Sequence, residues 1–258
     1  MLDKTVKRIL NADVYDAAVE TPLDRATALS TRLKNEVFIK REDLQEVFSF
    51  KIRGAYNKMS SLSAKQRSEG VLCASAGNHA QGLAQAAKLM GVRATIVMPV
   101  TTPEIKVASV RARGAKVVLF GDTFNDALSH ALALEKQRNL HFIHPFDDPE
   151  IIAGQGTVAM EIVHQHSAKI DAVFVPVGGG GLIAGIAAYI KTVRPETQVI
   201  GVEYEESASL AAAMAVGRRV KLRQVGIFAD GIAVAQVGKH TWPLMKQYVD
   251  GVITVSSD

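Results

Sequence analysis

The group in this chain best suited to covalent chemistry is Lys51, which directly follows the aromatic Phe50 at the expected start of a helix. An ordinary lysine is protonated at neutral pH. In a dry pocket, or beside other cations, its amine loses the proton more readily and becomes a nucleophile that forms Schiff bases. The sequence therefore predicts a nucleophilic amine at residue 51 if other segments build a pocket around it.

Four consecutive glycines, Gly178, Gly179, Gly180 and Gly181, separate an apolar strand pattern from a helix pattern that begins near Leu182. Glycines let a backbone approach an anion closely, and the free N–H groups at a helix start attract negative charge. No Lys-Ser or Lys-Thr pair follows, so this is not a Walker loop. A cofactor phosphate fits the pattern.

The same loop also satisfies a relaxed dinucleotide pattern, through Gly179, Gly181, Ala184 and an acid at Glu203. Three interpretations of the loop therefore stay open at this point. It could bind the phosphate of a cofactor, bind a dinucleotide, or form a tight turn without a ligand.

A second strand-to-helix junction holds Ser75, Ala76, Gly77, Asn78 and His79. Successive backbone N–H groups together with a hydroxyl form a nest that binds a carboxylate. Taken alone, Asn78 is better explained as the cap of the helix that follows. A histidine on an amphipathic helix is more often a half-buried structural residue than a catalyst, so we assign His79 no proton transfer.

Composition and patterning exclude several classes of protein. Basic residues are interleaved with acids, so the net charge of +4 forms no run that would bind nucleic acid. No apolar stretch is long enough to span a bilayer, and the N-terminus lacks the pattern of a secretory signal. The single cysteine, Cys73, cannot form an intramolecular disulfide. These features predict a cytoplasmic protein without a membrane or nucleic-acid partner.

Short β-branched runs alternate with longer helical patterns, which predicts an α/β fold with mainly parallel strands. The expected strands are Val37 to Lys40, Val71 to Ala74, Ala94 to Met98, Lys116 to Phe120, Ala172 to Val177, Gln198 to Glu203 and Val252 to Val255. The expected helices are Asn78 to Met90, Pro103 to Arg113, Asn125 to Arg138, Pro149 to His166 and Leu182 to Val193.

The turn-rich stretch from His144 to Pro149 and a second point near Gly54 are the expected crossings between two lobes. Residues 1–54 and 145–258 would then form a larger, cofactor-binding lobe. Residues 55–144 would form a smaller lobe that carries the loop from Ser75 to His79.

Four segments occur together in the order of a known family: 40–45 (Lys-Arg-Glu-Asp-Leu-Gln), 49–55 (Ser-Phe-Lys-Ile-Arg-Gly-Ala), 75–82 (Ser-Ala-Gly-Asn-His-Ala-Gln-Gly) and 178–182. In these segments the chain resembles the threonine dehydratases (threonine deaminases), and residues 47–51 most resemble the biosynthetic type. The resemblance implies a fold-type II enzyme dependent on pyridoxal 5'-phosphate, similar to the tryptophan synthase β chain. Such enzymes have two lobes, each with a mainly parallel sheet flanked by helices.

The resemblance also implies a role for each matching residue. Lys51 matches the lysine that carries the cofactor and removes the substrate α-proton, and Phe50 the aromatic that packs on the pyridine ring. Asn78 matches the amide that meets the ring hydroxyl. The phosphate cradle corresponds to Gly178, Gly179, Gly180, Gly181 and Leu182, and the substrate-carboxylate loop to Ser75, Ala76, Gly77, Asn78 and His79.

The implied reaction is the dehydration and deamination of L-threonine to 2-oxobutanoate and ammonia, the first step of isoleucine synthesis. A catabolic serine or threonine dehydratase and a non-catalytic fragment are the alternatives within the family, and a nicotinamide oxidoreductase is a distant one. Ala76 stands where serine racemases carry a second serine, which favours elimination. Ser207 and Ser209 follow Glu203 where metal-binding relatives have an acid, so we expect no metal.

Two further expectations concern the whole protein. In the family, the serine that meets the pyridine nitrogen and an isoleucine-sensing region both come after the strand at 251–255. The last residue of this chain is Asp258, so we expect a C-terminally truncated form with weaker cofactor retention. We also expect a homo-oligomer, a dimer or a tetramer, whose only other partner is a small amino-acid substrate.

Overall fold

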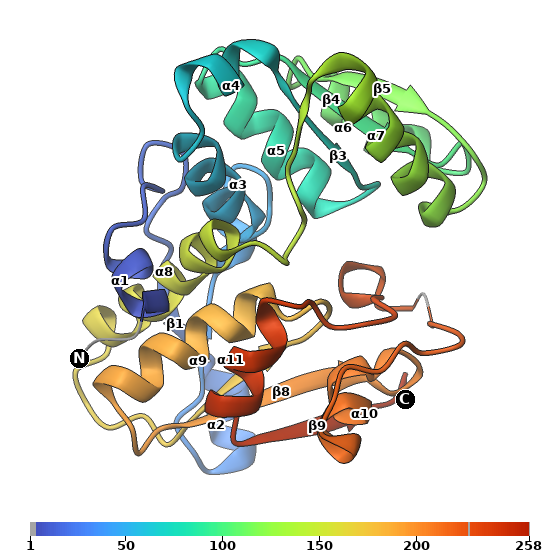
Figure 1. The fold of residues 1–258 in the computed structure, drawn as a ribbon. Helices are drawn as coiled ribbons and strands as arrows, with labels where there is room; N and C mark the ends of the chain where they lie inside the picture. Colours follow the sequence, from blue (N-terminus) through green and yellow to red (C-terminus); the bar gives the residue numbers. More distant parts are fainter. Residues whose placement is uncertain (1–3, 227, 258) are drawn as a thin grey trace.

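The computed structural model describes residues 4–226 and 228–257, which form an α/β fold with two separate parallel sheets (Figure 1). The helices are α1 (Lys4–Leu10), α2 (Thr27–Leu33), α3 (Lys51–Ser60), α4 (Ala64–Glu69), α5 (Asn78–Leu89), α6 (Glu104–Arg111), α7 (Phe124–Arg138), α8 (Pro149–Gln165), α9 (Gly181–Val193), α10 (Ser209–Val216) and α11 (Thr241–Tyr248), with 3-10 turns η1 (Glu42–Leu44), η2 (Glu205–Ser207) and η3 (Asp230–Ile232). The strands are β1 (Leu23–Arg25), β2 (Phe38–Lys40), β3 (Val71–Ala74), β4 (Ala94–Met98), β5 (Lys116–Leu119), β6 (His141–Phe142), β7 (Ala172–Pro176), β8 (Gln198–Tyr204) and β9 (Gly251–Val255).

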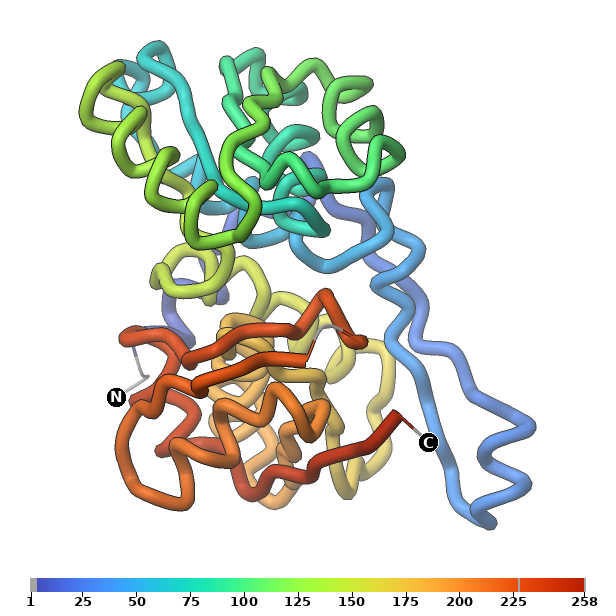
Figure 2. Tube along the Cα trace, turned by 90° about the vertical axis from the view of Figure 1, so that its right-hand side faces the viewer, coloured from blue at the N-terminus to red at the C-terminus, as the bar shows by residue number. Residues whose placement is uncertain are grey.

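The two parallel sheets have the strand orders β5-β4-β3-β6 and β7-β8-β9. All the expected strands and helices are present, with ends shifted by a few residues. The strand expected at residues 37–40 is β2, but it does not belong to a parallel sheet. It pairs antiparallel with β1, a strand that the sequence did not predict. This pair and α2 form an arm beside the rest of the molecule (Figure 2).

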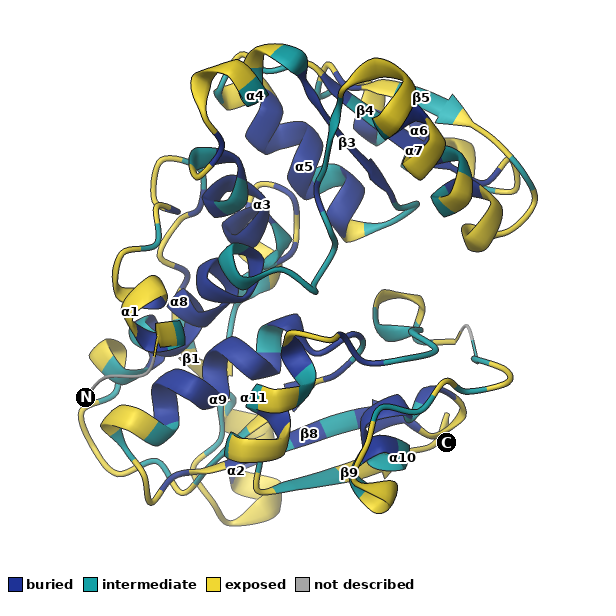
Figure 3. Cartoon of the chain, in the orientation of Figure 1, coloured by how far each residue is buried: buried dark blue, intermediate teal, exposed yellow. Residues whose placement is uncertain are grey.

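Helix α8 joins the two halves, because it packs against α3 on one side and α9 on the other. The approach is close enough to require glycine at both contacts. A Cβ at Gly154 would lie 2.6 Å from Cα of Gly54, and one at Gly185 would lie 2.7 Å from N of Gly156. Figure 3 shows α8 and α9 as largely buried helices in the centre of the molecule. The start of α3, which carries Lys51, is thereby fixed relative to α9.

A buried ion network strengthens the same contact. Arg53, two residues after Lys51, is fully buried and pairs with Glu42 at 2.7 Å and with Glu161 at 2.5 Å. Lys40 at the end of β2 pairs with Glu161 at 2.6 Å. Charges removed from water require such partners, so the network ties α3 to the base of the arm and to α8. The division into lobes at residues 54 and 145 stays a prediction.

Candidate active site

Lys51 is the first residue of α3; the residue is half-buried, and the protein around its amine removes much of the water from it. Nζ donates a hydrogen bond to the carbonyl oxygen of Pro145 at 2.9 Å and lies 5.2 Å from the centroid of the Phe50 ring. Burial lowers the pKa of Lys51 from 10.5 to about 8. About a tenth of this amine is therefore unprotonated at pH 7, far more than for an exposed lysine, as a nucleophile or base requires.

The glycine loop lies between the end of β7 at Pro176 and the start of α9 at Gly181. Gly180 precedes the helix with φ of +94°, a conformation that favours glycine. The first N–H groups of α9 have no carbonyl partner within the helix and carry the positive end of its dipole. The loop thus offers an anion several backbone donors.

Phe146 connects the glycine loop to Lys51. A Cβ at Gly179 would lie 2.3 Å from the Phe146 ring, and one at Gly181 would lie 3.1 Å from the backbone of the same residue. The preceding residue, Pro145, accepts the hydrogen bond of the lysine amine. Lys51 and the glycine loop therefore contact the same two-residue segment, Pro145 and Phe146.

The loop from Ser75 to His79 leads from β3 into α5, and its backbone is only partly buried. Ser75 Oγ accepts a hydrogen bond from the N–H of Gly77 at 3.2 Å. Helix α5 begins at Asn78 itself, with Gly77 at the cap position and no side-chain cap, so Asn78 does not have the capping role that the sequence allowed. Its side chain is exposed and available to a ligand.

Turn η3 lies beside both loops. A Cβ at Gly231 would lie 3.9 Å from Nδ2 of Asn78, and one at Gly178 would lie 3.1 Å from Cα of Ile232. Lys106 of α6 also pairs with Asp230 at 2.6 Å. The loop from Ser75 to His79 and the glycine loop are therefore both neighbours of turn η3.

Two histidines near Lys51 are held neutral. His79 is buried, its Nε2 donates to the carbonyl oxygen of Ile143 at 2.9 Å, and burial together with the Lys51 charge lowers its pKa to about 3. Burial also lowers the pKa of His144. Nδ1 of His144 accepts two backbone N–H groups, from Phe146 at 3.2 Å and Asp147 at 2.8 Å. His79 is thus a satisfied structural residue, in line with the sequence interpretation.

Sequence reasoning missed the contribution of residues 144–147. The motif was recognised as a turn-rich crossing, but its contacts with Lys51 and with Gly179 depend on tertiary structure. The signal that could have found it is the pair of polar residues, His144 and Asp147, that flank Pro-Phe at a crossing between lobes.

The dinucleotide interpretation loses its acidic residue. Glu203 is fully buried, and its two oxygens accept the N–H groups of Leu210 and Ala211, each at 2.8 Å. The carboxylate therefore caps the first turn of α10 and is not free for a ribose. Among residues 4–226 and 228–257, no three His, Cys, Asp or Glu side chains cluster as a metal site would require.

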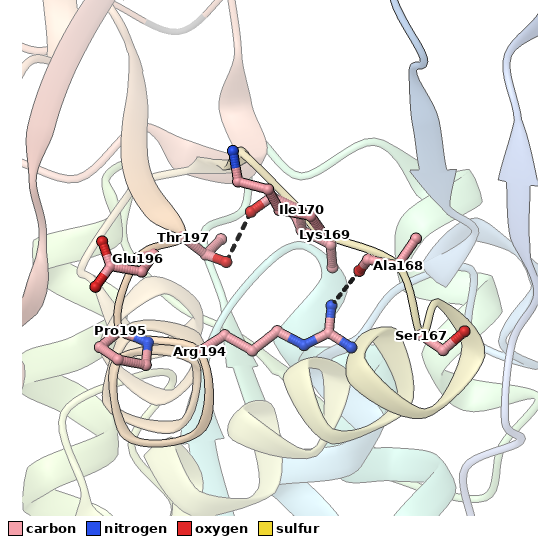
Figure 4. Close-up of a pocket in the computed structure, with 8 residues that line it drawn as sticks. All are labelled: Ser167, Ala168, Lys169, Ile170, Arg194, Pro195, Glu196 and Thr197. Atoms are coloured by element: carbon pink, nitrogen blue, oxygen red, sulfur yellow. Dashed lines mark hydrogen bonds between the residues drawn. The ribbon is translucent and has the colours of Figure 1, made fainter.

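A shallow pocket elsewhere is lined by residues 167–170 and 194–197 (Figure 4). The Arg194 guanidinium donates to the carbonyls of Ala168 and His166, both at 2.7 Å. Thr197 Oγ1 donates to the carbonyl of Ile170 at 2.8 Å. These polar groups satisfy one another, and none of the lining residues belongs to the site around Lys51.

The residues around Lys51 fit pyridoxal phosphate. The glycine loop presents the free N–H groups at the start of α9 to an anion, and Phe146 and Pro145 link it to an amine with a lowered pKa. The profile of a family described as pyridoxal-phosphate-dependent enzymes matches residues 14–258 of this chain. The chain belongs to the pyridoxal-phosphate-dependent enzymes.

Named relatives within this family support the resemblance to biosynthetic threonine dehydratases. The "L-threonine dehydratase biosynthetic IlvA" of Burkholderia multivorans is 57% identical over 256 residues, 98% of this chain and 50% of that protein. The chloroplastic biosynthetic threonine dehydratase of Arabidopsis thaliana is 55% identical over 97% of this chain and 42% of its own. The processed threonine deaminase isoform 2 of Solanum lycopersicum matches in structure with a TM-score of 0.96 and 51% identity, over 98% of this chain and 74% of its own.

These matches confirm the predicted fold-type II class and the predicted cofactor, pyridoxal phosphate. This chain spans about half the length of the curated relatives it matches. No helix in the described part of the chain is long and apolar enough to cross a membrane.

Proposed function

We propose that this chain is the catalytic part of a threonine dehydratase that converts L-threonine to 2-oxobutanoate and ammonia, the first step of isoleucine synthesis. The observation that carries the proposal is the position of the Lys51 amine, whose pKa is lowered to about 8. This amine donates a hydrogen bond to Pro145, and the next residue, Phe146, packs on Gly179 of the glycine loop. Relatives whose names specify the biosynthetic threonine dehydratase support the choice of reaction.

Pyridoxal phosphate, when bound, accepts the electrons left behind as the substrate α-proton departs. Lys51 is the residue suited to hold the cofactor, because it is the amine beside the cradle. With cofactor and substrate bound, the Lys51 amine would be the base positioned to take the α-proton. The pKa of about 8 lets it take that proton near neutral pH.

Backbone groups do most of the binding in this proposal. N–H groups from Gly178 to Leu182 hold the phosphate, with the start of α9 behind them. The loop from Ser75 to His79 holds the substrate carboxylate through its N–H groups and the Ser75 hydroxyl. Phe50 packs on the ring, and the exposed Asn78 amide meets the ring hydroxyl.

Ala76 supports elimination over racemisation, because a methyl group offers no proton to the opposite face of the substrate. A catabolic serine or threonine dehydratase is the second candidate, since the family resemblance of the cofactor and carboxylate segments extends to that type. We further propose a homo-oligomer, a dimer or a tetramer, and a cytoplasmic location.

The test measures 2-oxobutanoate released from L-threonine and from L-serine, together with the near-visible absorbance of lysine-linked pyridoxal phosphate. Lys51→Ala should abolish both signals, and Lys65→Ala, at an exposed position on α4, should keep both. Near-normal rates in Lys51→Ala would refute the assigned role. A parent chain that shows the absorbance without turnover would favour the non-catalytic fragment.

A further inference from the structure

We propose that Asp147 is a positioning residue that fixes the glycine loop through the start of α11. The proposal deepens the proposed function and rests on its assignment of the loop as the phosphate cradle. Asp147 lies in the segment 144–147, whose other members contact Lys51 and Gly179.

The Asp147 carboxylate lies at the start of α11 and accepts three backbone N–H groups there. Oδ2 accepts from Lys239 at 2.7 Å, and Oδ1 accepts from His240 at 2.6 Å and from Thr241 at 3.3 Å. A carboxylate at this position is stabilised by the helix dipole and makes stronger hydrogen bonds than a neutral acceptor. The interaction joins two segments more than ninety residues apart.

Gly238 lies directly against this carboxylate, where a larger residue would not fit. A Cβ at Gly238 would lie 2.2 Å from Oδ1 of Asp147 and 2.8 Å from Oγ1 of Thr241. Any side chain at residue 238 would displace both groups. The contact therefore depends on the carboxylate of Asp147 and on the absence of a side chain at Gly238.

The same turn holds the glycine loop from the other side. The carbonyl oxygen of Gly179 accepts the N–H of Gly238 at 3.1 Å and the Thr241 hydroxyl at 2.8 Å. In a trans peptide the N–H of the next residue points opposite to the carbonyl. With its carbonyl fixed toward α11, the peptide between Gly179 and Gly180 presents the Gly180 N–H away from α11, as a donor for the cradle.

Asp147 thus controls both walls of the cradle. Through residues 238–241 it fixes the Gly179 carbonyl, and through its own backbone it fixes the Phe146 ring that packs on Gly179. The N–H of Asp147 donates to His144 Nδ1, which keeps the segment in its turn. Its carboxylate acts through these groups and touches neither cofactor nor substrate.

The test compares Asp147→Asn with Asp250→Asn in the full 258-residue chain. Asp250 is a matched control, because its carboxylate also accepts a backbone N–H, from Val199 at 2.7 Å, and pairs with Lys191 without reaching the glycine loop. The first readout is hydrogen exchange of residues 178–182 without cofactor. The second is the dissociation constant of pyridoxal phosphate.

Asp147→Asn places an amide donor against backbone donors, so we expect faster exchange at 178–182 and a dissociation constant raised roughly tenfold. Thr241→Val should show the same faster exchange and weaker binding, because it lacks the hydroxyl that bonds to Gly179. Thr241→Ser keeps this hydroxyl and should behave like the parent chain. Asp250→Asn should lower the unfolding midpoint while leaving both readouts unchanged.

Unchanged exchange in Asp147→Asn and Thr241→Val would overturn the proposal, as would an equal effect of Asp250→Asn. A parent chain that bound no pyridoxal phosphate would contradict the proposed function instead. The exchange experiment, done without cofactor, would still decide whether Asp147 holds the loop.

Discussion

Replacing Lys51 with methionine should make the cofactor-free chain more stable at neutral pH. Methionine has a similar length and no charge to bury. The pKa of Lys51 falls from 10.5 to about 8, a shift of 10.5 − 8 = 2.5, equivalent to about 3.4 kcal/mol at 1.36 kcal/mol for each pH unit. The residue keeps partial exposure, and its bond to Pro145 offsets about 1 kcal/mol. We therefore expect a net gain of about 2 kcal/mol.

The gain should depend on pH with a definite sign. The folded-state pKa of Lys51, about 8, lies below the unfolded value of 10.5, so the unfolded chain binds more protons between these two values. Stability of the parent chain consequently rises with pH across this window. The penalty of the buried charge is nearly full below about pH 8 and has almost gone by pH 10.5.

Urea unfolding of the cofactor-free chains at pH 7, 9 and 10.5 measures the effect. The difference in the free energy of unfolding between Lys51→Met and the parent should be largest at pH 7 and should shrink as the pH rises. Lys65→Met, at an exposed helix position, controls for the general effect of losing a lysine charge and should show no such trend. A variant less stable than the parent at pH 7, or a difference independent of pH, would refute the reasoning.

Three further predictions concern the packing around this lysine. Arg53→Met should cost about 3 kcal/mol in urea unfolding, because the buried Glu161 is left with Lys40 alone and the half-buried Glu42 loses its pairing with Arg53. A loss similar to that of Arg41→Met, whose ion pairs are exposed, would contradict this. Gly154→Ala should cost about 1–3 kcal/mol, because the new methyl group would meet the backbone of α3, and an unchanged urea midpoint would be inconsistent with that contact. The His79 imidazole should show no NMR titration between pH 5 and 8, since its pKa lies near 3, and a midpoint inside that range would mean that the ring is hydrated.

The longer strands and helices could be predicted because their own residues show which faces are buried and where each helix begins. Strands buried on both faces, such as β3 and β4, read as continuous apolar runs. Long helices such as α7 and α8 carry N-cap residues, Thr123 and Asp148, at their first turns. The fold class follows from the alternation of such elements, which is a local property.

The short elements could not be predicted in the same way. Strand β1 has three residues and β6 two, so neither shows a period. Helix α11 depends on a carboxylate supplied by Asp147, far away in sequence, and its own preceding residue gives no side-chain cap. The sequence placed Asn78 as a possible helix cap, whereas Gly77 takes that position. The start of α11 depends on a partner from another part of the chain, whereas the Asn78 miss is a shift of one residue in the start of a helix.

The activation of Lys51 shows the same limit, because the sequence left two causes open, neighbouring cations or a dry pocket. The structure favours the pocket: burial is what lowers the Lys51 pKa, and His79 beside it is neutral. With a pKa of about 8, roughly a quarter of the amine is unprotonated at about pH 7.5, against about one part in a thousand for an exposed lysine. The burial that lowers stability is thus the same burial that supplies a reactive amine, and a substitution that hydrates the pocket should raise stability and suppress reactivity together.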